Sequence, residues 1–178
     1  MRRLDGRVAL VTGASRGFGR AIAVAFGQEG ADVAVNYRTS ASGAAEVAAA
    51  LGKLGRRALV VEADVASEAD VNELIGATLS RFGRLDILVN NAGIMERGLF
   101  ADVAVSTYTR MFATNVTGTM LCTRAALPAM IERRYGRIVN LSSQLARARA
   151  AAPNSNTLLA CPVRPNGRCS ITTSPSRR

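Results

Sequence analysis

The sequence predicts an α/β protein with an open, doubly wound parallel sheet that is truncated after about the fifth strand. Two observations support this class. Short apolar runs rich in β-branched residues alternate with longer segments of helical period, and the first run leads into a glycine-rich turn. Because consecutive strands separated by a helix form right-handed crossovers, this order predicts parallel pairing.

The expected strands are short and apolar nearly throughout, which is typical of parallel strands covered by helices on both faces. They are RVALVT (7–12), DVAVNY (32–37), RALVVE (57–62), LDILVN (85–90) and GRIVNL (136–141). A sheet that stopped at the last of these strands would leave that strand as an exposed edge.

Four segments between the strands are long enough for crossover helices. They lie at 17–30, 42–54, 67–82 and about 105–133. Ser67 followed by Asp70 indicates a capping box at the start of the third helix. From about residue 146 the periodicity fails, and four prolines among scattered Ser, Thr and Asn predict loop or disorder.

The net charge of the chain is unevenly distributed. The formal charge is +10, a value that suggests a nucleic-acid or acidic membrane partner. Residues 1–132 hold all 13 acidic side chains and 14 basic ones, whereas residues 133–178 hold nine arginines and no acid. The arginines beyond residue 146 lie among prolines with no aromatic residue for stacking, so a nucleic-acid arm is the least favoured interpretation.

Composition also bears on metal binding and targeting. The chain has no histidine, and its widely spaced Cys122, Cys161 and Cys169 predict reduced thiols and no metal site. Near the N-terminus, Asp5 and Arg7 stand where a secretory signal would be apolar, and the apolar runs are short. We therefore expect a cytoplasmic protein with no membrane partner.

The segment TGASRGFG joins the first expected strand to the first helix. Its Gly13, Gly17 and Gly19 follow a G-x3-G-x-G pattern. Glycine lets the backbone approach a ligand closely, and the free N–H groups at a helix N-terminus favour a pyrophosphate. A merely tight strand-to-helix turn is the alternative.

The end of the second strand indicates which dinucleotide is bound. An NAD site places an acidic residue there for the ribose 2′-hydroxyl, whereas NADP needs positive charge for its 2′-phosphate. Tyr37 stands where the acid would be, Arg38 follows it, and Arg16 lies in the glycine turn. Two guanidinium groups favour NADP(H) over NAD(H). The alternative for each arginine is a solvated surface charge.

With TGASRGFG, three further motifs in order resemble the short-chain dehydrogenase/reductase family. They are ADV with Asp64, NNAG at 90–93, and NVTG with Asn115 followed by GRIVNLSS. The likeness covers about residues 5–145. Within the family, the sequence is most similar to 3-oxoacyl-[acyl-carrier-protein] reductase-like members. The likeness implies an incomplete NAD(P)-binding Rossmann-like domain at 1–145. We interpret the irregular Arg/Pro-rich tail at 146–178 as out of frame or disordered.

The resemblance also implies an oxidoreductase that transfers hydride between NADP(H) and a small carbonyl or alcohol substrate. Asn115 would hold a water in the proton relay, or else be a helix kink or surface amide, and Ser143 would hydrogen-bond the substrate carbonyl. Asp64 and Val65 would border the adenine. Asn90, Ala92 and Gly93 would form the floor under the adenosine and stabilise the central strand, with a simple polar strand end as the alternative for Asn90 and Asn91. The implied cofactor-binding residues are Gly13, Ser15, Arg16, Gly17, Phe18, Gly19, Arg38, Asp64, Val65, Asn90, Ala92 and Gly93.

The family's proton donor is a tyrosine with a lysine four residues later, and these 178 residues contain no such pair. The tyrosines are Tyr37, Tyr108 and Tyr135, none followed by lysine at that spacing, and the only lysine is Lys53. Loss of a general acid costs about 10² to 10⁴ in rate, so little or no turnover is expected.

Two interpretations of the C-terminal region therefore stay open beside the nucleic-acid arm. One is a frameshift or truncating change beyond about Ser143, which the other reading frames of the encoding DNA would reveal. The other is a non-catalytic relative that binds NADP or a partner protein. In either case, the sheet face that a further helix would cover stays apolar and exposed. This predicts association through the fourth helix, for example as a homo-oligomer.

Overall fold

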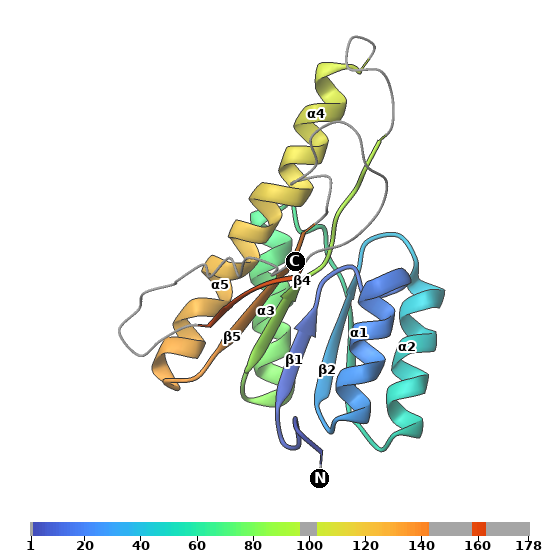
Figure 1. The fold of residues 1–178 in the computed structure, drawn as a ribbon, viewed down its shortest axis with the longest axis vertical. Coiled ribbons are helices and arrows are strands. Elements are labelled where there is room, and N and C mark those ends of the chain that lie inside the picture. The colour runs from blue at the N-terminus through green and yellow to red at the C-terminus, as the bar shows by residue number, and fades with distance from the viewer. Residues whose placement is uncertain (1, 97–102, 143–157, 163–178) are drawn as a thin grey trace, which may run out of the picture.

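A central sheet organises the fold of the computed structural model, which describes residues 2–96, 103–142 and 158–162. The strand order is β3-β2-β1-β4-β5-β6 (Figure 1). The strands are β1 Val8–Val11, β2 Asp32–Tyr37, β3 Ala58–Glu62, β4 Ile87–Asn90, β5 Arg137–Leu141 and β6 Leu158–Pro162. The helices are α1 Gly17–Gln28, α2 Ala41–Lys53, α3 Glu68–Phe82, α4 Val105–Phe112 and α5 Gly118–Glu132, with a π-helical turn at Ala113–Thr117 between the last two.

The strands from β1 to β5 all pair in parallel, which confirms the predicted fold class. The central strand β1 pairs with β2 on one side and with β4 on the other, so that Val8 lies opposite Asp32 and Ala9 opposite Ile87. Both β1 and β4 are buried along their whole length. Their uninterrupted apolar sequence is explained by helices covering both faces.

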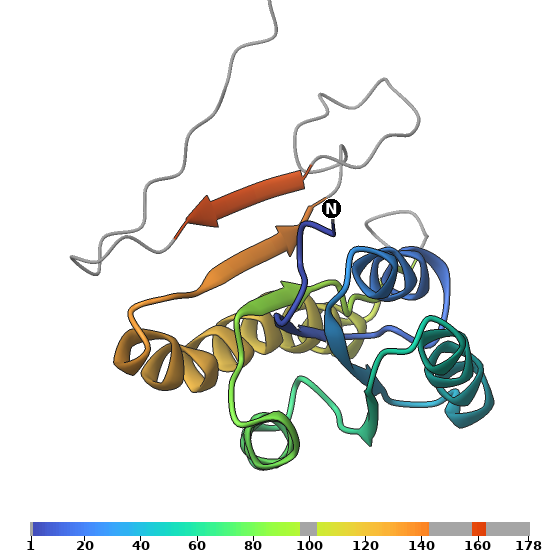
Figure 2. The ribbon, with the colours of Figure 1, turned by 90° about the horizontal axis from the view of Figure 1, so that it is seen from below.

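Alternate residues of β1 point into two separate cores, one on each face of the sheet. Val8 and Leu10 belong to the core beneath α3 and α5, whereas Ala9 and Val11 belong to the core beneath α1 and α2. Figure 2 shows α1 and α2 on one side of the sheet and α3 and α5 on the other. Cys122 of α5 packs in the first core, and burial raises the pKa of its thiol to about 11. The thiol is therefore neutral at pH 7 and packs as an apolar group.

The N-terminus of α3 has the predicted cap. Ser67 Oγ accepts a hydrogen bond from the Asp70 N–H at 3.3 Å and donates one to Asp70 Oδ1 at 2.7 Å. The second carboxylate oxygen, Asp70 Oδ2, accepts from the N–H of Asp64 at 2.9 Å. These bonds, the one from Asp64 first, lower the pKa of Asp70. The cap therefore ties the start of α3 to the residues that follow β3.

The segment at about 105–133 was expected to form one helix, but the structure divides it into two. The π-helical turn at Ala113–Thr117 separates α4 from α5, and Pro128 lies inside α5. At the junction, Gly118 lies so close to the end of β3 that a Cβ there would be 2.8 Å from Val65 Cγ2. A π turn inserts an extra residue and rotates the side chains around it. A prediction from the spacing of apolar residues assumes a constant 3.6 residues per turn, so it does not reveal a π turn.

The sheet continues beyond the last expected strand. Residues 158–162, predicted to be loop or disorder, form β6, which pairs antiparallel to β5 with Leu158 opposite Leu141. This corrects the expectation that β5 would be an exposed edge. The unpaired backbone groups of β5 provide a template for another strand, and the apolar run LLAC supplies one. The rest of the expected tail, 146–157 and 163–178, lies outside the described residues.

Across the ranges that the structure describes, every helix is too short or too polar to cross a membrane.

The Ser67 cap gives a test of the α3 boundary. We expect Ser67→Ala to lower the free energy of unfolding by about 1 kcal/mol, because the N–H of Asp70 loses its acceptor. Urea denaturation followed by circular dichroism measures the change. Ser80→Ala is the matched control, since Ser80 is exposed within the same helix and its replacement should change stability by about 0.5 kcal/mol or less. Equal effects of the two substitutions would contradict the capping role.

Candidate functional site

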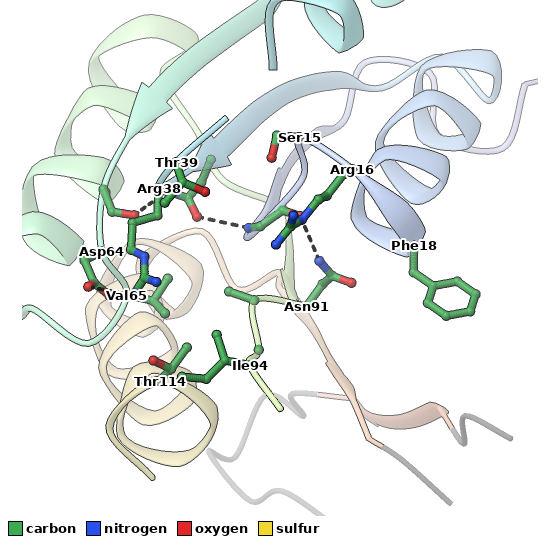
Figure 3. A pocket seen from close by; sticks show the side chains of 15 residues that line it. Ser15, Arg16, Phe18, Arg38, Thr39, Asp64, Val65, Asn91, Ile94 and Thr114 are labelled. Carbon is green, nitrogen blue, oxygen red and sulfur yellow. Dashed lines mark hydrogen bonds and ion pairs between the residues drawn. The ribbon is translucent and has the colours of Figure 1, made fainter. Parts of the chain in front are cut away.

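A cavity of about 240 Å³ opens at the carboxyl ends of the parallel strands (Figure 3). In the sheet, β2 lies on one side of β1 and β4 on the other, so the strand order reverses at β1. The cavity lies at this reversal, which is the position at which open α/β sheets bind ligands. The cavity is lined by Gly13, Ser15, Arg16, Phe18, Asn36, Arg38, Thr39, Ala63, Asp64, Val65, Asn91, Ala92, Gly93, Ile94 and Thr114.

Two glycines let the chain from the end of β1 to the first turn of α1 pack closely against its neighbours. Gly13 has φ +61°, and a Cβ there would lie 3.0 Å from Ala92 Cα. A Cβ on Gly19 would lie 2.4 Å from Asn91 Nδ2 and 2.5 Å from Gly13 O. The turn is therefore packed against the residues that follow β4, with no room for a side chain between them.

The N-terminus of α1 is open toward an anion. Its N-cap residue, Arg16, is extended and makes no side-chain cap hydrogen bond. The first-turn N–H groups thus lack the side-chain acceptor that usually satisfies them, and the helix dipole adds positive charge at this end. Since Gly13, Arg16 and Phe18 line the cavity beside this turn, the residues present fit a pyrophosphate.

Asn91 and Thr12 hold the glycine turn against β4. The Thr12 hydroxyl oxygen accepts hydrogen bonds from the N–H groups of Asn91 and Ala92, both at 3.0 Å. In return, Asn91 Nδ2 donates to Thr12 O at 2.8 Å and to Gly13 O at 3.1 Å. Sequence reasoning gave Asn91 no role beyond a polar strand end, although its place inside the NNAG motif was the available signal.

Asn36 is a second residue that sequence reasoning missed. It is buried at the end of β2, where its Oδ1 accepts from the N–H of Gly13 at 3.1 Å and its Nδ2 donates to Ala63 O at 3.0 Å. One amide thus links the glycine turn to the end of β3. An asparagine within the otherwise apolar run DVAVN was the sequence signal.

Charged residues gather where β2 and β3 end. Arg38 Nη1 pairs with Asp64 Oδ2 at 3.3 Å, and both side chains line the cavity (Figure 3). Beside them, the Tyr37 hydroxyl donates to Glu62 Oε2 at 3.1 Å, and this hydrogen bond raises the pKa of Tyr37. Arg16 forms no ion pair with any described residue. The two arginines predicted to bind a 2′-phosphate are therefore in different electrostatic environments.

Asn115 lies in the π-helical turn and binds the chain after β4. Its Oδ1 accepts from the N–H of Ile94 and its Nδ2 donates to Ile94 O, both at 2.9 Å. One residue earlier, Thr114 is buried and lines the cavity close to Val65 and Ile94 (Figure 3). The turn therefore presents Thr114 to the cavity while Asn115 fixes the cavity wall.

The structure places most of the predicted cofactor residues around one cavity. Those that line it are Gly13, Ser15, Arg16, Phe18, Arg38, Asp64, Val65, Ala92 and Gly93. Gly17 and Gly19 lie in the first turn of α1. Asn90 lies inside the sheet, where its Nδ2 donates to Asn140 Oδ1 at 2.8 Å and to Thr123 Oγ1 at 3.2 Å. Ser143 and residues 97–102 lie outside the described residues.

The described part of the chain holds no group of three His, Cys, Asp or Glu side chains that could bind a metal ion. The fold, the strand-order reversal and the glycine turn define the class, an α/β protein of the dinucleotide-binding type.

Comparison with known proteins identifies the family. The sequence pattern described as short chain dehydrogenase matches residues 7–154. The chain is 44% identical over 143 residues to an uncharacterized oxidoreductase of Methylorubrum extorquens, and 42% identical over 143 residues to a 3-oxoacyl-[acyl-carrier-protein] reductase of Synechocystis. These alignments cover 80% of this chain, and 57% and 58% of the two relatives. This chain belongs to the short-chain dehydrogenase/reductase family.

A solved structure supports the same assignment. A short chain dehydrogenase from Burkholderia cenocepacia in complex with NADP superposes with a TM-score of 0.77 and is 40% identical; the match covers 84% of this chain and 60% of that one. The chain therefore spans less than two thirds of the length of the relatives it matches.

The packing of the glycine turn can be tested by adding one methyl group. We expect Gly19→Ala to destabilise the fold by about 1 to 3 kcal/mol and to weaken nucleotide binding, because the new Cβ overlaps the amide of Asn91 and the carbonyl of Gly13. Thermal unfolding measures the first effect and calorimetry the second. Gly76→Ala is the control: a Cβ at this position in α3 meets nothing within 4 Å, so it should leave binding unchanged and add up to about 1 kcal/mol of stability. Unchanged binding in Gly19→Ala would contradict the role of this turn.

Proposed function

We propose that this chain binds NADP(H) in the cavity at the carboxyl ends of β1 to β4. The observation that carries the proposal is the tight glycine turn, which leads into an α1 N-terminus without a side-chain cap and beside Arg16. A pyrophosphate supplies the acceptors that this turn lacks. Arg16 and Arg38 supply positive charge for a 2′-phosphate, and the NADP complex of the Burkholderia relative supports this choice over NAD.

The other walls of the cavity suit the rest of the adenosine. Asp64 and Val65 follow β3 and line the cavity together with Thr114. Asp64 offers an adenine ring a polar group, and the methyl groups of Val65 and Thr114 offer it apolar contacts. Ala92 and Gly93 lie across from them on the chain after β4, where the hydrogen bonds to Thr12 and Asn115 hold the backbone in place. A rigid wall of this kind lowers the entropy lost on binding.

We further propose that the whole protein acts on a small carbonyl or alcohol substrate. When bound, a reduced nicotinamide supplies a hydride to the carbonyl carbon, and the carbonyl oxygen must then gain a proton. In this proposal Ser143 hydrogen-bonds the carbonyl oxygen, and Asn115 orients a water for the proton relay. Asn115 bonds Ile94 through both amide atoms, and its backbone oxygen accepts from Thr119 Oγ1 at 3.0 Å. Each of its two oxygens keeps a second lone pair that could accept from the water.

The 178 residues lack the Tyr-x-x-x-Lys pair, so we propose that this chain binds NADP(H) with little or no turnover. A phenol near pKa 10 needs a neighbouring cation to give up its proton at neutral pH. Without both groups, the developing alkoxide has no proton donor. The chain would then act as a non-catalytic nucleotide-binding protein, or as one component of an assembly.

A specific surface favours the second of these roles. Phe112, Val116 and Met120 lie at helical spacing from the end of α4 through the π-helical turn into α5, and they are exposed to 63%, 46% and 66%. Large apolar side chains in one row on a helix are typical of a contact surface. We propose that two copies of this chain associate through this row.

The nucleotide proposal is tested by titration. NADPH should bind the purified chain, seen as a change in nicotinamide fluorescence, and should do so more tightly than NADH because of the two arginines. Oxidation of NADPH with a small ketone substrate should be slower by about 10² to 10⁴ than for the Synechocystis reductase under the same conditions. Gly19→Ala serves as the binding-deficient control. Equal affinity for both nucleotides, or turnover at the rate of the reductase, would contradict the proposal.

The association proposal has its own test. Met120→Glu places a charge in the exposed apolar row, and we expect it to convert dimers to monomers in light scattering, because burying an unpaired carboxylate is costly. Ala49→Glu is the matched control, since Ala49 is exposed on α2, on the opposite face of the sheet. A mass that stays the same in both variants would rule out this row as the contact.

A further inference from the structure

We propose that Asp64 lowers the preference of this chain for NADP over NAD by competing with the 2′-phosphate for Arg38. The inference rests on the proposed nucleotide function and adds a residue that sets its selectivity. It follows from three features of the cavity: the ion pair between these two side chains, the anchoring of Asp64, and the different state of Arg16.

The ion pair spans the end of the cavity where β2 and β3 finish. Arg38 comes directly after β2 and Asp64 shortly after β3, and both line the cavity (Figure 3). The pair is a single contact between Arg38 Nη1 and Asp64 Oδ2 at 3.3 Å, with side chains 45% and 36% exposed. A guanidinium that faces a carboxylate offers a phosphate less net attraction than one that faces water.

Asp64 is the fixed partner in this pair. Its Oδ1 accepts from the N–H of Ala66 at 2.9 Å, and its own N–H donates to Asp70 Oδ2 at 2.9 Å. Asp70 in turn belongs to the cap of α3. The hydrogen bond from Ala66 holds the carboxylate in place, so Arg38 is the partner that releases the contact in order to face the 2′-phosphate.

The other charges nearby do not offset this competition. Arg16 also lines the cavity and pairs with no described carboxylate, so its charge is already available to a phosphate. Glu62 accepts a hydrogen bond from the Tyr37 hydroxyl at 3.1 Å and forms no ion pair with Arg38. Only Asp64, among the described residues, couples directly to a predicted phosphate-binding arginine.

The substitution that isolates the charge is Asp64→Asn. An asparagine keeps an oxygen for the Ala66 N–H, so the backbone turn is retained while the negative charge is lost. Two nucleotides that differ only in the 2′-phosphate, adenosine 2′,5′-bisphosphate and adenosine 5′-monophosphate, are titrated by calorimetry at low ionic strength. Any loss of an adenine contact lowers both affinities equally. The ratio of the two affinities should rise about two- to fivefold, the range for an exposed ion pair.

A second background separates competition for Arg38 from direct repulsion of the phosphate. In Arg38→Ala, the same Asp64→Asn substitution should change the affinity ratio by less than about 1.5-fold, because no guanidinium remains to be released. Glu62→Gln is the matched control, since it removes a carboxylate at the end of β3 that does not contact Arg38. It should leave the ratio unchanged.

The outcomes are distinct. A ratio that stays constant or falls in Asp64→Asn overturns the inference, and a fall would mean that Asp64 orients Arg38 for the phosphate. A rise of equal size with and without Arg38 also overturns it, since the effect would then be direct repulsion. If neither nucleotide binds the unaltered chain, the proposed function fails and the inference fails with it.

Discussion

The contact between the glycine turn and the chain after β4 is the constraint on which the rest of the site depends. A Cβ on Gly19 would overlap Asn91 Nδ2 at 2.4 Å, so the turn and the NNAG segment can meet only where one side chain is absent. The closeness lets one amide bind two carbonyl oxygens of the turn, at 2.8 and 3.1 Å. Because the turn is held from behind, little ordering remains to be lost when an anion binds beside it.

The two ends of the sheet use polar side chains for different purposes. At the amino ends, Asp86 is buried, accepts from the N–H of Val8 at 2.9 Å and pairs with Arg84 at 2.5 Å, so its charge is used inside the protein. At the carboxyl ends, Arg16 and Arg38 keep a large share of their donors free of other described groups. The charge of Asp86 is thus neutralised within the protein, whereas the two arginines at the carboxyl ends can still contact a ligand.

Regular periodicity was enough to predict the parallel strands and the first three helices, because burial on one or both faces fixes which positions are apolar. It failed where local winding or pairing departs from that rule. The π-helical turn that carries Thr114 and Asn115 inserts a residue that a constant period does not show. The strand at Leu158–Pro162 pairs with β5 through backbone groups, which carry no residue-specific signal. Asn36 and Asn91 act through side-chain bonds to distant backbone atoms, and such partners are known only once the strands are placed.

The central position of β1 has a consequence for the order in which the molecule assembles. Val8 pairs with Asp32, close by along the chain, but Ala9 pairs with Ile87, far beyond it. Closing the longer loop costs more chain entropy, so β1 and β2 can meet early while β4 arrives late. The wall formed by Ala92 and Gly93 comes with β4. During synthesis, therefore, the half of the cavity at β2 and β3 can form first, and the proposed nucleotide site is complete only after β4 has joined the sheet.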